Sequence, residues 1–230
     1  MKNTSRDSTV EPQYDVTLEL KERKGFARFG LMSNFTWEDD PRHLAFTFSR
    51  YKFVSKMLSG RSHVLEVGCG DAFFTRLVRQ EVDRLTATDI DPVFVEDAAQ
   101  TMSSRWDYEI KTHNMLTGPL EGPFDGAYSL DVLEHIEPED ERTFLSNVAA
   151  SLTPHGVFLV GSPSLESQAY ASAASKAGHV NCKDEPSLKK LMSEFFENVF
   201  MFSMNDEVVH TGYAPMAHYR FALGCTRKSQ

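Results

Sequence analysis

A glycine-rich turn is the first place in this chain where the residue types could hold a small ligand. The segment Glu66-Val67-Gly68-Cys69-Gly70-Asp71-Ala72 follows a short β-rich run and precedes a helical stretch. Glycines at such a turn let the backbone approach a ligand, and the helix start offers free N–H groups. The dinucleotide-binding pattern requires Gly or Ala three residues after its second glycine, where this chain has Phe73, and the Gly-Lys-Ser/Thr of a P-loop is absent. The turn therefore fits neither of these phosphate-binding patterns.

Two carboxylates near the turn indicate which other ligand it could hold. Glu66, two residues before the first glycine, would repel a phosphate but attract an ammonium group, directly or through water. Asp89 follows Gly70 by nineteen residues and ends a second β-rich run, where a carboxylate can accept hydrogen bonds from both ribose hydroxyls. S-adenosylmethionine has a ribose and an ammonium group but no phosphate. The joint pattern therefore predicts that this chain binds S-adenosylmethionine.

The elements that must position these residues alternate between short strands and helices from Arg61 onward. Such alternation indicates βαβ units, and hence a mostly parallel sheet with helices on both faces. Upstream, Asp40-Pro41 is typical of a helix start and Gly60 of a helix end, and residues 25–32 are expected to form a structured loop. The expected strands are residues 64–67, 85–88, 108–111, 124–130, 157–160, 199–203 and 219–226.

In these motifs the chain resembles the class I S-adenosylmethionine-dependent methyltransferases, particularly those of the small-molecule type. The resemblance covers about residues 61–165 and implies a Rossmann-like α/β fold. That fold has a seven-stranded, mostly parallel sheet with helices on both faces and a reversed last strand. We expect residues 1–16 to be flexible, residues 17–60 to form an N-terminal helical lid, and residues 61–230 to form the cofactor-binding domain. The matching motifs are Val64–Gly70, Ala87–Asp91, Phe124–Ile136 and Leu152–Val160.

The resemblance also implies a set of cofactor-binding residues. The family often has an Asp after the third strand that accepts the adenine amino group, and the matching residue here is Asn114, whose carbonyl can accept the same hydrogen bond. Met115 beside it could form an apolar wall for the adenine ring or could be an ordinary core residue. The full expected set is Glu66, Gly68, Cys69, Gly70, Asp89, Ile90, Asn114, Met115 and Leu130.

Candidates for catalysis lie where the family presents the methyl acceptor, above the carboxyl edge of the sheet. Asp131, Glu134 and His135 follow the fourth expected strand, and Ser162 follows the fifth. His179 lies in residues 166–182, which resemble the family's variable acceptor loop. A neutral imidazole could take the acceptor's proton near neutral pH, so His179 is the first candidate for a general base and His135 the second. Asp131 could act as a base or as a water-bridged cofactor contact. Each histidine could instead have a structural role.

Two other segments could shape the acceptor pocket. Residues 205–219 include two carboxylates and two histidines, and they could recognise the acceptor or form a solvated loop. Their spacing matches no tight metal-ligand pattern, so the sequence predicts no metal site. Near the N-terminus, an aromatic stretch is expected to cover the cofactor or to pack against the core. It consists of Phe26, Phe29, Met32, Phe35 and Trp37.

Charge and composition indicate which binding partners and which cellular compartment to expect. With 33 acidic and 24 basic residues the formal net charge is -9, which disfavours nucleic acid as a partner. Three widely separated cysteines indicate reduced thiols, and no apolar run reaches the roughly 18–20 residues of a membrane span. The polar residues 1–13 do not read as a secretory signal. We therefore expect a cytoplasmic protein, a monomer or homodimer, that acts on a small molecule without membrane attachment.

The function that these observations predict is methyl transfer from S-adenosylmethionine to a small polar acceptor. An oxygen on a sugar or other metabolite is the leading acceptor. The alternatives are N-methylation of a protein, a peptide or tRNA, and a cofactor-binding scaffold subunit without catalysis.

The placement of Asp89 can be tested directly. Asp89→Ala should remove two charge-assisted hydrogen bonds to the ribose, each worth on the order of 1.5–3 kcal/mol. Affinity for S-adenosylmethionine, measured by calorimetric titration, should fall at least about tenfold while the fold survives. Unchanged affinity would reject the assignment of Asp89 to the ribose.

Overall fold

A single mixed sheet organises the residues that the computed structural model describes, which are 8–228. Within that range eight strands follow the order β3-β2-β1-β4-β5-β8-β6-β7. The pairings between β3, β2, β1, β4 and β5 are parallel, and β8 runs antiparallel to both β5 and β6. The strands are β1 (His63–Val67), β2 (Arg84–Asp89), β3 (Glu109–Thr112), β4 (Phe124–Leu130), β5 (Leu152–Pro163), β6 (Phe196–Asn205), β7 (Val208–His210) and β8 (Tyr219–Arg227).

The predicted Rossmann-like sheet with a reversed last strand is confirmed, but the predicted number of seven strands is wrong by one. The additional strand is β7, which pairs antiparallel with the end of β6 from Asn205 to Ser203. Asp206 starts the turn between them at φ 48°, a left-handed conformation that Asp tolerates better than most residues do. The polar segment expected to be a loop thus begins as a hairpin.

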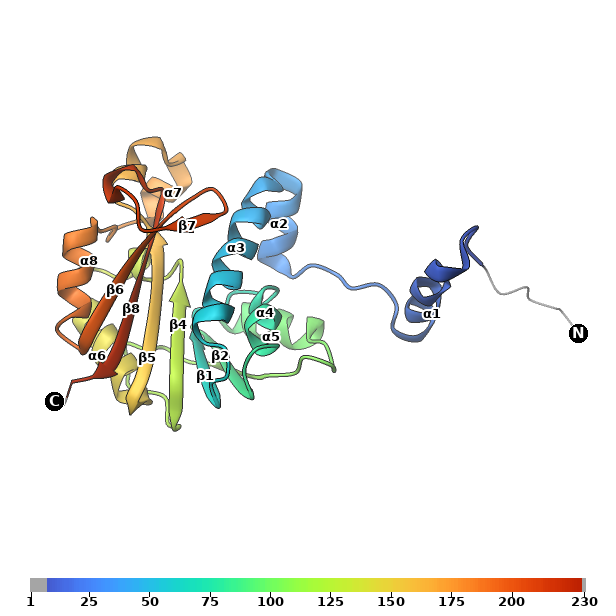
Figure 1. Cartoon of the computed structure of the whole chain (residues 1–230), viewed down its shortest axis with the longest axis horizontal. Helices are drawn as coiled ribbons and strands as arrows, with labels where there is room; N and C mark the ends of the chain where they lie inside the picture. The colour runs from blue at the N-terminus through green and yellow to red at the C-terminus, as the bar shows by residue number, and fades with distance from the viewer. Residues whose placement is uncertain (1–7, 229–230) are drawn as a thin grey trace, which may run out of the picture.

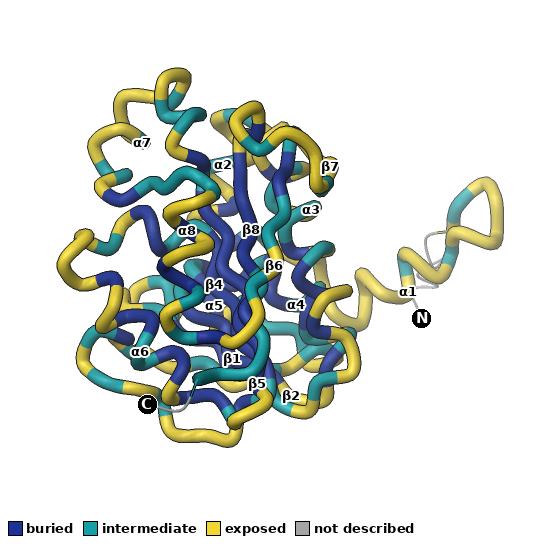
Figure 2. The backbone as a smooth tube through the Cα atoms, turned by 60° about the vertical axis from the view of Figure 1, so that its left-hand side comes forward, coloured by how far each residue is buried: buried dark blue, intermediate teal, exposed yellow. Residues whose placement is uncertain are grey.

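Two apolar clusters hold helices against opposite faces of the sheet. Successive residues of a strand point to opposite faces, and Val64 and Leu65 accordingly belong to different clusters. Helices α3 (Arg42–Met57), α4 (Thr75–Arg79) and α5 (Pro92–Thr101) pack with the Val64 cluster, whereas α6 (Glu141–Ser151) and α8 (Glu185–Met192) pack with the Leu65 cluster. Figure 2 shows the buried strands between more exposed helical layers. This layering confirms helices on both faces.

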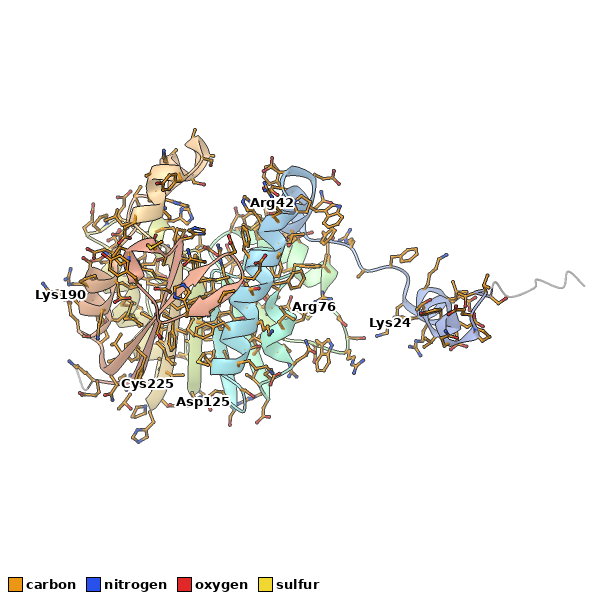
Figure 3. All side chains as sticks on the ribbon, turned by 45° about the horizontal axis from the view of Figure 1, so that its top comes forward. Lys24, Arg42, Arg76, Asp125, Lys190 and Cys225 are labelled. Atoms are coloured by element: carbon orange, nitrogen blue, oxygen red, sulfur yellow. The ribbon has the colours of Figure 1, made fainter. Side chains whose placement is uncertain are left out.

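The N-terminal residues divide into an outlying arm and the segment expected to be a lid. The 3-10 helix η1 (Pro12–Tyr14) and α1 (Asp15–Lys24) project from the domain (Figures 1 and 3), and Lys24 at the end of α1 contacts Ser104 of the domain over 3.3 Å. The next helix, α2 (Leu31–Asp39), lies beside α3 (Figure 1) and begins within the segment expected to be a loop. Residues 1–7 of the segment predicted to be flexible lie outside the described residues, and flexibility of the remainder stays a prediction.

Helix α2 is held to the domain by carboxylates that are distant in sequence. The first turn of a helix has backbone N–H groups without partners inside the helix. In α2, Leu31 N–H donates to Asp97 over 2.8 Å, and Ser33 donates to Asp71 through its N–H over 2.7 Å and its hydroxyl over 3.2 Å. A Cβ on Gly30 would lie 2.4 Å from Asp71 Cβ, so only glycine allows this approach. Asp71, inside the glycine-rich turn, therefore fastens the lid over that turn.

Removal of Asp71 should weaken this fastening. Asp71→Ala would leave the N–H and hydroxyl of Ser33 and the N–H of Phe73 without their acceptor, at a buried site. We expect a loss of about 1–3 kcal/mol in the free energy of unfolding, measured by urea denaturation. Ser33→Ala, which removes only the hydroxyl donor, should cost less. Equal stability of Asp71→Ala and wild type would show that α2 is not held in this way.

Candidate functional site

A cavity of about 310 Å³ lies at the carboxyl ends of β1, β2 and β4, beneath α2 and α3. Ligands of open α/β sheets bind at this edge. The glycine-rich turn forms one wall and helices α2 and α3 form another, and His135 lines the cavity together with Asp131 and Val132. Lining residues from these elements include Met32, Tyr51, Gly70, Asp89, Asp131 and His135.

The turn itself requires its glycines. Gly68 and Gly70 have φ of 79° and 53°, in the left-handed region that favours glycine. A Cβ on Gly68 would lie 2.2 Å from Val132 Cγ2, and one on Gly70 would lie 2.6 Å from Met32 Sδ. The backbone of Gly68, Cys69 and Gly70 therefore borders the cavity directly.

Asp89 occupies the position expected of a ribose-binding carboxylate. It lines the cavity, and its two oxygens accept hydrogen bonds from the N–H groups of Gly70 (2.8 Å) and Asp91 (2.9 Å). These bonds fix the carboxylate between the turn and the start of α5. Since a carboxylate oxygen has two acceptor sites, each oxygen can still accept from a ligand hydroxyl.

Glu66 lies behind the cavity wall rather than in it. Its side chain is 1% exposed and accepts hydrogen bonds from the hydroxyls of Tyr51 and Thr75, both over 2.7 Å. Burial raises the pKa of Glu66 to about 7, although these hydrogen bonds oppose the shift. Tyr51 lines the cavity, so Glu66 reaches it through the Tyr51 hydroxyl. Direct or water-mediated contact between Glu66 and an ammonium group stays a prediction.

The other expected cofactor residues divide into two groups. Cys69 and Leu130 line the cavity. Ile90 is 66% exposed, Asn114 is exposed with its side-chain oxygen accepting from Leu116 N–H, and Met115 is buried in an apolar cluster. None of these last three lines the cavity, and their contact with a cofactor stays a prediction.

The lid residues that line the cavity differ from the aromatic ones expected. Met32 lines it, but Phe29 stacks on Trp37 with ring centroids 5.6 Å apart, and Phe26 and Phe35 are largely exposed. Sequence reasoning missed the other lining residues of the lid because it treated the lid as a loop with a following helix. Helical periodicity through α2 and α3 could have identified them. They are Ser33, Thr36, Leu44, Thr47 and Tyr51.

Asp131 lines the cavity near His135 and forms an ion pair. Its φ is 57°, and its two oxygens accept from Arg50 Nη1 over 3.0 and 2.9 Å. The Arg50 guanidinium also stacks over the Tyr219 ring, 3.9 Å from the ring centroid. Because Arg50 compensates its charge, Asp131 is better suited to holding a substrate or a neighbouring group than to removing a proton.

His135 and His179 come from different segments and meet beside Asp131. Their ring centroids are 5.2 Å apart. His135 belongs to the 3-10 helix η2 (Leu133–His135), and His179 follows α7 (Ala173–Gly178), which lies after η3 (Glu166–Tyr170). Burial, followed by the nearby His135, lowers the pKa of His179 from 6.5. The role of either imidazole as a general base stays a prediction.

Glu134, one of the candidates that the sequence places after the fourth strand, lies close to these two rings. It is 1% exposed, and both carboxylate oxygens lack a hydrogen-bond partner among the described residues. Burial, and then the charge of Asp131, raise the pKa of Glu134 well above its usual range. One ligand atom each from Glu134, His135 and His179 lie within 4.8 Å of one another. In the sequence, Glu134 stands out by its position next to His135 in the fourth-strand motif.

Two other features lie apart from this site. In the segment 205–219, His210 contacts Asn205 within its own hairpin, over 2.8 Å, and the segment contributes nothing to the cavity wall. A larger hollow of about 590 Å³ lies near the opposite end of β5 and is lined by residues that include Pro154, Glu194 and Arg227. It contains neither the glycine-rich turn nor Asp89. Across residues 8–228, no helix has the length and apolar character that crossing a membrane would need.

Comparison with known proteins shows which families and folds this chain is similar to. Residues 64–156 match the family model described as a methyltransferase domain. The ubiquinone biosynthesis O-methyltransferase of Xanthomonas axonopodis pv. citri is 26% identical over 161 residues, and that of Xanthomonas oryzae pv. oryzae is equally similar. Each match spans 66% of this chain and 66% of the relative, so this chain covers about two thirds of those proteins' length.

Solved structures share the fold. The N-methyltransferase NodS from Bradyrhizobium japonicum WM9, in complex with S-adenosyl-L-homocysteine, has a TM-score of 0.58 at 21% identity and covers 84% of this chain and 90% of its own. Human N-acetylserotonin methyltransferase in complex with S-adenosylmethionine has a TM-score of 0.61 at 16% identity and covers 81% of this chain and 54% of its own.

The buried Glu66 predicts a pH dependence of stability. The folded chain keeps the Glu66 proton up to a higher pH than the unfolded chain does. The free energy of unfolding should therefore fall as pH rises from about 4.5 to about 7, and then level off. This one group contributes up to on the order of 3 kcal/mol.

Glu66→Gln lacks this titration, so its stability relative to wild type should increase across that pH window. Urea denaturation at a series of pH values checks this, with Glu121→Gln at an exposed site as the control. A difference between Glu66→Gln and wild type that does not change with pH would contradict the assignment.

Proposed function

We propose that the chain is a class I S-adenosylmethionine-dependent methyltransferase that methylates an oxygen of a small polar acceptor, on the basis of the methyltransferase-domain match over residues 64–156. A sugar or another hydroxylated metabolite is the acceptor class we favour. The observation that carries the proposal is the cavity, which runs from the glycine-rich turn and Asp89 to a polar edge formed by Asp131 and His135.

The cofactor end of the cavity suits S-adenosylmethionine. Asp89 would accept the ribose hydroxyls, and the backbone of Gly68 and Gly70 permits close approach of the methionine part. The turn carries no basic side chain to neutralise a phosphate, whereas the buried Glu66 behind Tyr51 favours a nearby ammonium group. The methyl group would then face the edge where Asp131 and the two histidines lie.

Methyl transfer at this edge is an in-line displacement. The acceptor oxygen forms a bond to the methyl carbon as the carbon–sulfur bond breaks, and the sulfonium becomes the neutral thioether of S-adenosylhomocysteine. The hydroxyl proton passes to a base or to water, so atoms and charge balance. Because the sulfonium is a good leaving group, correct positioning of the acceptor supplies much of the catalysis.

The acceptor end consists of groups that suit hydroxyls. We assign Asp131, His135 and His179 to the acceptor, with residues 166–182 as the acceptor loop. That loop contacts the histidine edge, because the Gly178 carbonyl lies 2.8 Å from His135 Nδ1 and the Gln168 side chain lies 2.9 Å from His179 Nδ1. The acidic net charge supports a small metabolite over tRNA.

The proposal is tested by measuring S-adenosylhomocysteine release with separate pools of hydroxylated metabolites, amines and peptides. We expect release with the hydroxylated pool. Release with amines or peptides alone would favour N-methylation, and cofactor binding without release on any pool would favour the scaffold alternative. Either result would contradict the proposal.

Gly70→Val provides the cofactor-binding variant for this assay. A β-branched residue at φ 53° beside the cavity should abolish S-adenosylmethionine binding and with it product release. Gly60→Val is the matched control, because Gly60 has a similar φ of 79° but has no neighbour for a Cβ within 4 Å. It should bind the cofactor as wild type does. Normal binding by Gly70→Val would place the cofactor elsewhere.

A further inference from the structure

The Glu134 carboxyl group is buried without a polar partner in the described part of the molecule. Its side chain is 1% exposed, and neither oxygen has a hydrogen-bond partner among residues 8–228. The nearby Arg50 guanidinium is directed to Asp131 instead, with both contacts at 3.0 Å or less. Burial of an unpaired carboxylate is costly, and a bound cation is one of the few ways to offset the cost.

The histidines beside Glu134 are oriented by carbonyl oxygens. His135 Nδ1 lies 2.8 Å from the Gly178 carbonyl, and His179 Nδ1 lies 2.9 Å from Gln168 Oε1. The Gln168 amide is oriented by its own Nε2, which contacts Ser164 O and Ser167 Oγ. A carbonyl oxygen only accepts hydrogen bonds, so each Nδ1 carries the proton, and the other nitrogen of a neutral ring keeps its lone pair. Histidines that bind metals are typically held by a carbonyl in this way.

Backbone contacts hold the two segments together at this point. The N–H groups of Val180 and Asn181 donate to the Glu134 carbonyl over 2.8 and 3.0 Å. His179 is therefore fixed next to Glu134 by its own following residues. One potential ligand atom from each of Glu134, His135 and His179 then lie within 4.8 Å of one another. Two metal–ligand bonds of ~2.1 Å span at most ~4.2 Å, so small side-chain rotations would bring the three atoms to a common ion.

We propose that Glu134, His135 and His179 form a binding site for a divalent transition-metal ion. Two imidazole nitrogens and one carboxylate suit Zn²⁺, Co²⁺, Mn²⁺ or Fe²⁺. Three protein ligands leave coordination positions open, as in catalytic rather than structural sites. The ligands come from two segments, so no short sequence spacing reveals the site. For this reason the sequence predicts no metal, whereas the geometry leads to the opposite proposal.

The ion would lie at the acceptor edge of the cavity, because His135 lines that cavity. An open coordination position there suits an acceptor hydroxyl, whose acidity a bound cation increases. The role of the ion in catalysis rests on the proposed methyl transfer, whereas the binding of the ion does not. A metal in this position would favour acceptors whose oxygen can coordinate a metal ion.

Metal binding is tested on the full chain after treatment with a chelator. Co²⁺ is the probe, because its visible absorption reports nitrogen ligation and geometry, and Zn²⁺ competition follows by calorimetry. We expect one ion per chain. His135→Ala, His179→Ala and the isosteric Glu134→Gln should each weaken binding at least about tenfold, and Gln168→Leu should weaken it ~10–100-fold by releasing His179. His155→Ala, at an exposed site near the other end of β5, should bind as wild type does.

Absence of saturable Co²⁺ binding would overturn the proposal, as would wild-type affinity in both histidine variants. Thermal unfolding of each variant checks that it is folded, and Glu134→Gln, which replaces the carboxylate ligand by an amide of the same size, keeps the test decisive if a histidine variant unfolds. Product release is measured on the same preparations with and without chelator. Metal binding without product release on any pool would support the metal site and contradict the proposed function. Product release that is insensitive to removal of a bound ion would overturn the role at the acceptor.

Discussion

The hydrogen bond from Gly70 N–H to Asp89 is the contact on which the rest of the site depends. It joins the turn after β1 to the end of β2 over 2.8 Å, at the carboxyl edge of the parallel strands. The bond requires a left-handed glycine, and the adjacent Asp71 then faces the first turn of α2. One turn with left-handed glycines therefore sets the position of the carboxylate proposed to bind the ribose and of helix α2 above it.

The carboxyl groups in and around the cavity differ in the partners that they have. Asp131 has a guanidinium, Glu66 has two hydroxyl donors, and Glu134 has neither. These partners indicate three different roles. The ion pair with Arg50 fixes the position of Asp131, and the two hydroxyls hold Glu66 behind the cavity wall. Glu134, without a partner, suits a bound cation. The carboxyl groups of the site thus lie both near the glycine-rich turn and near the two histidines.

Short motifs in the sequence were enough to predict the strands and the turn that match the motifs of the family. The strand 124–130 has the bounds expected, and the turn and Asp89 lie where the glycine spacing places them. The eighth strand could not be predicted because β7 has three residues and depends on pairing with β6. Helix α2 was missed because Asp71 and Asp97, distant in sequence, satisfy its first turn. Glu134 was a candidate in the sequence, but not as a metal ligand, because that role depends on its burial and on His179, which only the folded chain brings close to it.

A crystal structure with S-adenosylhomocysteine tests the central claim most directly. The ribose hydroxyls should lie on Asp89, the homocysteine part should lie along the Gly68–Gly70 backbone, and the sulfur should face the edge formed by Asp131 and His135. Ligand density elsewhere, for example in the hollow lined by Pro154 and Arg227, with the cavity under α2 lacking ligand, would contradict it.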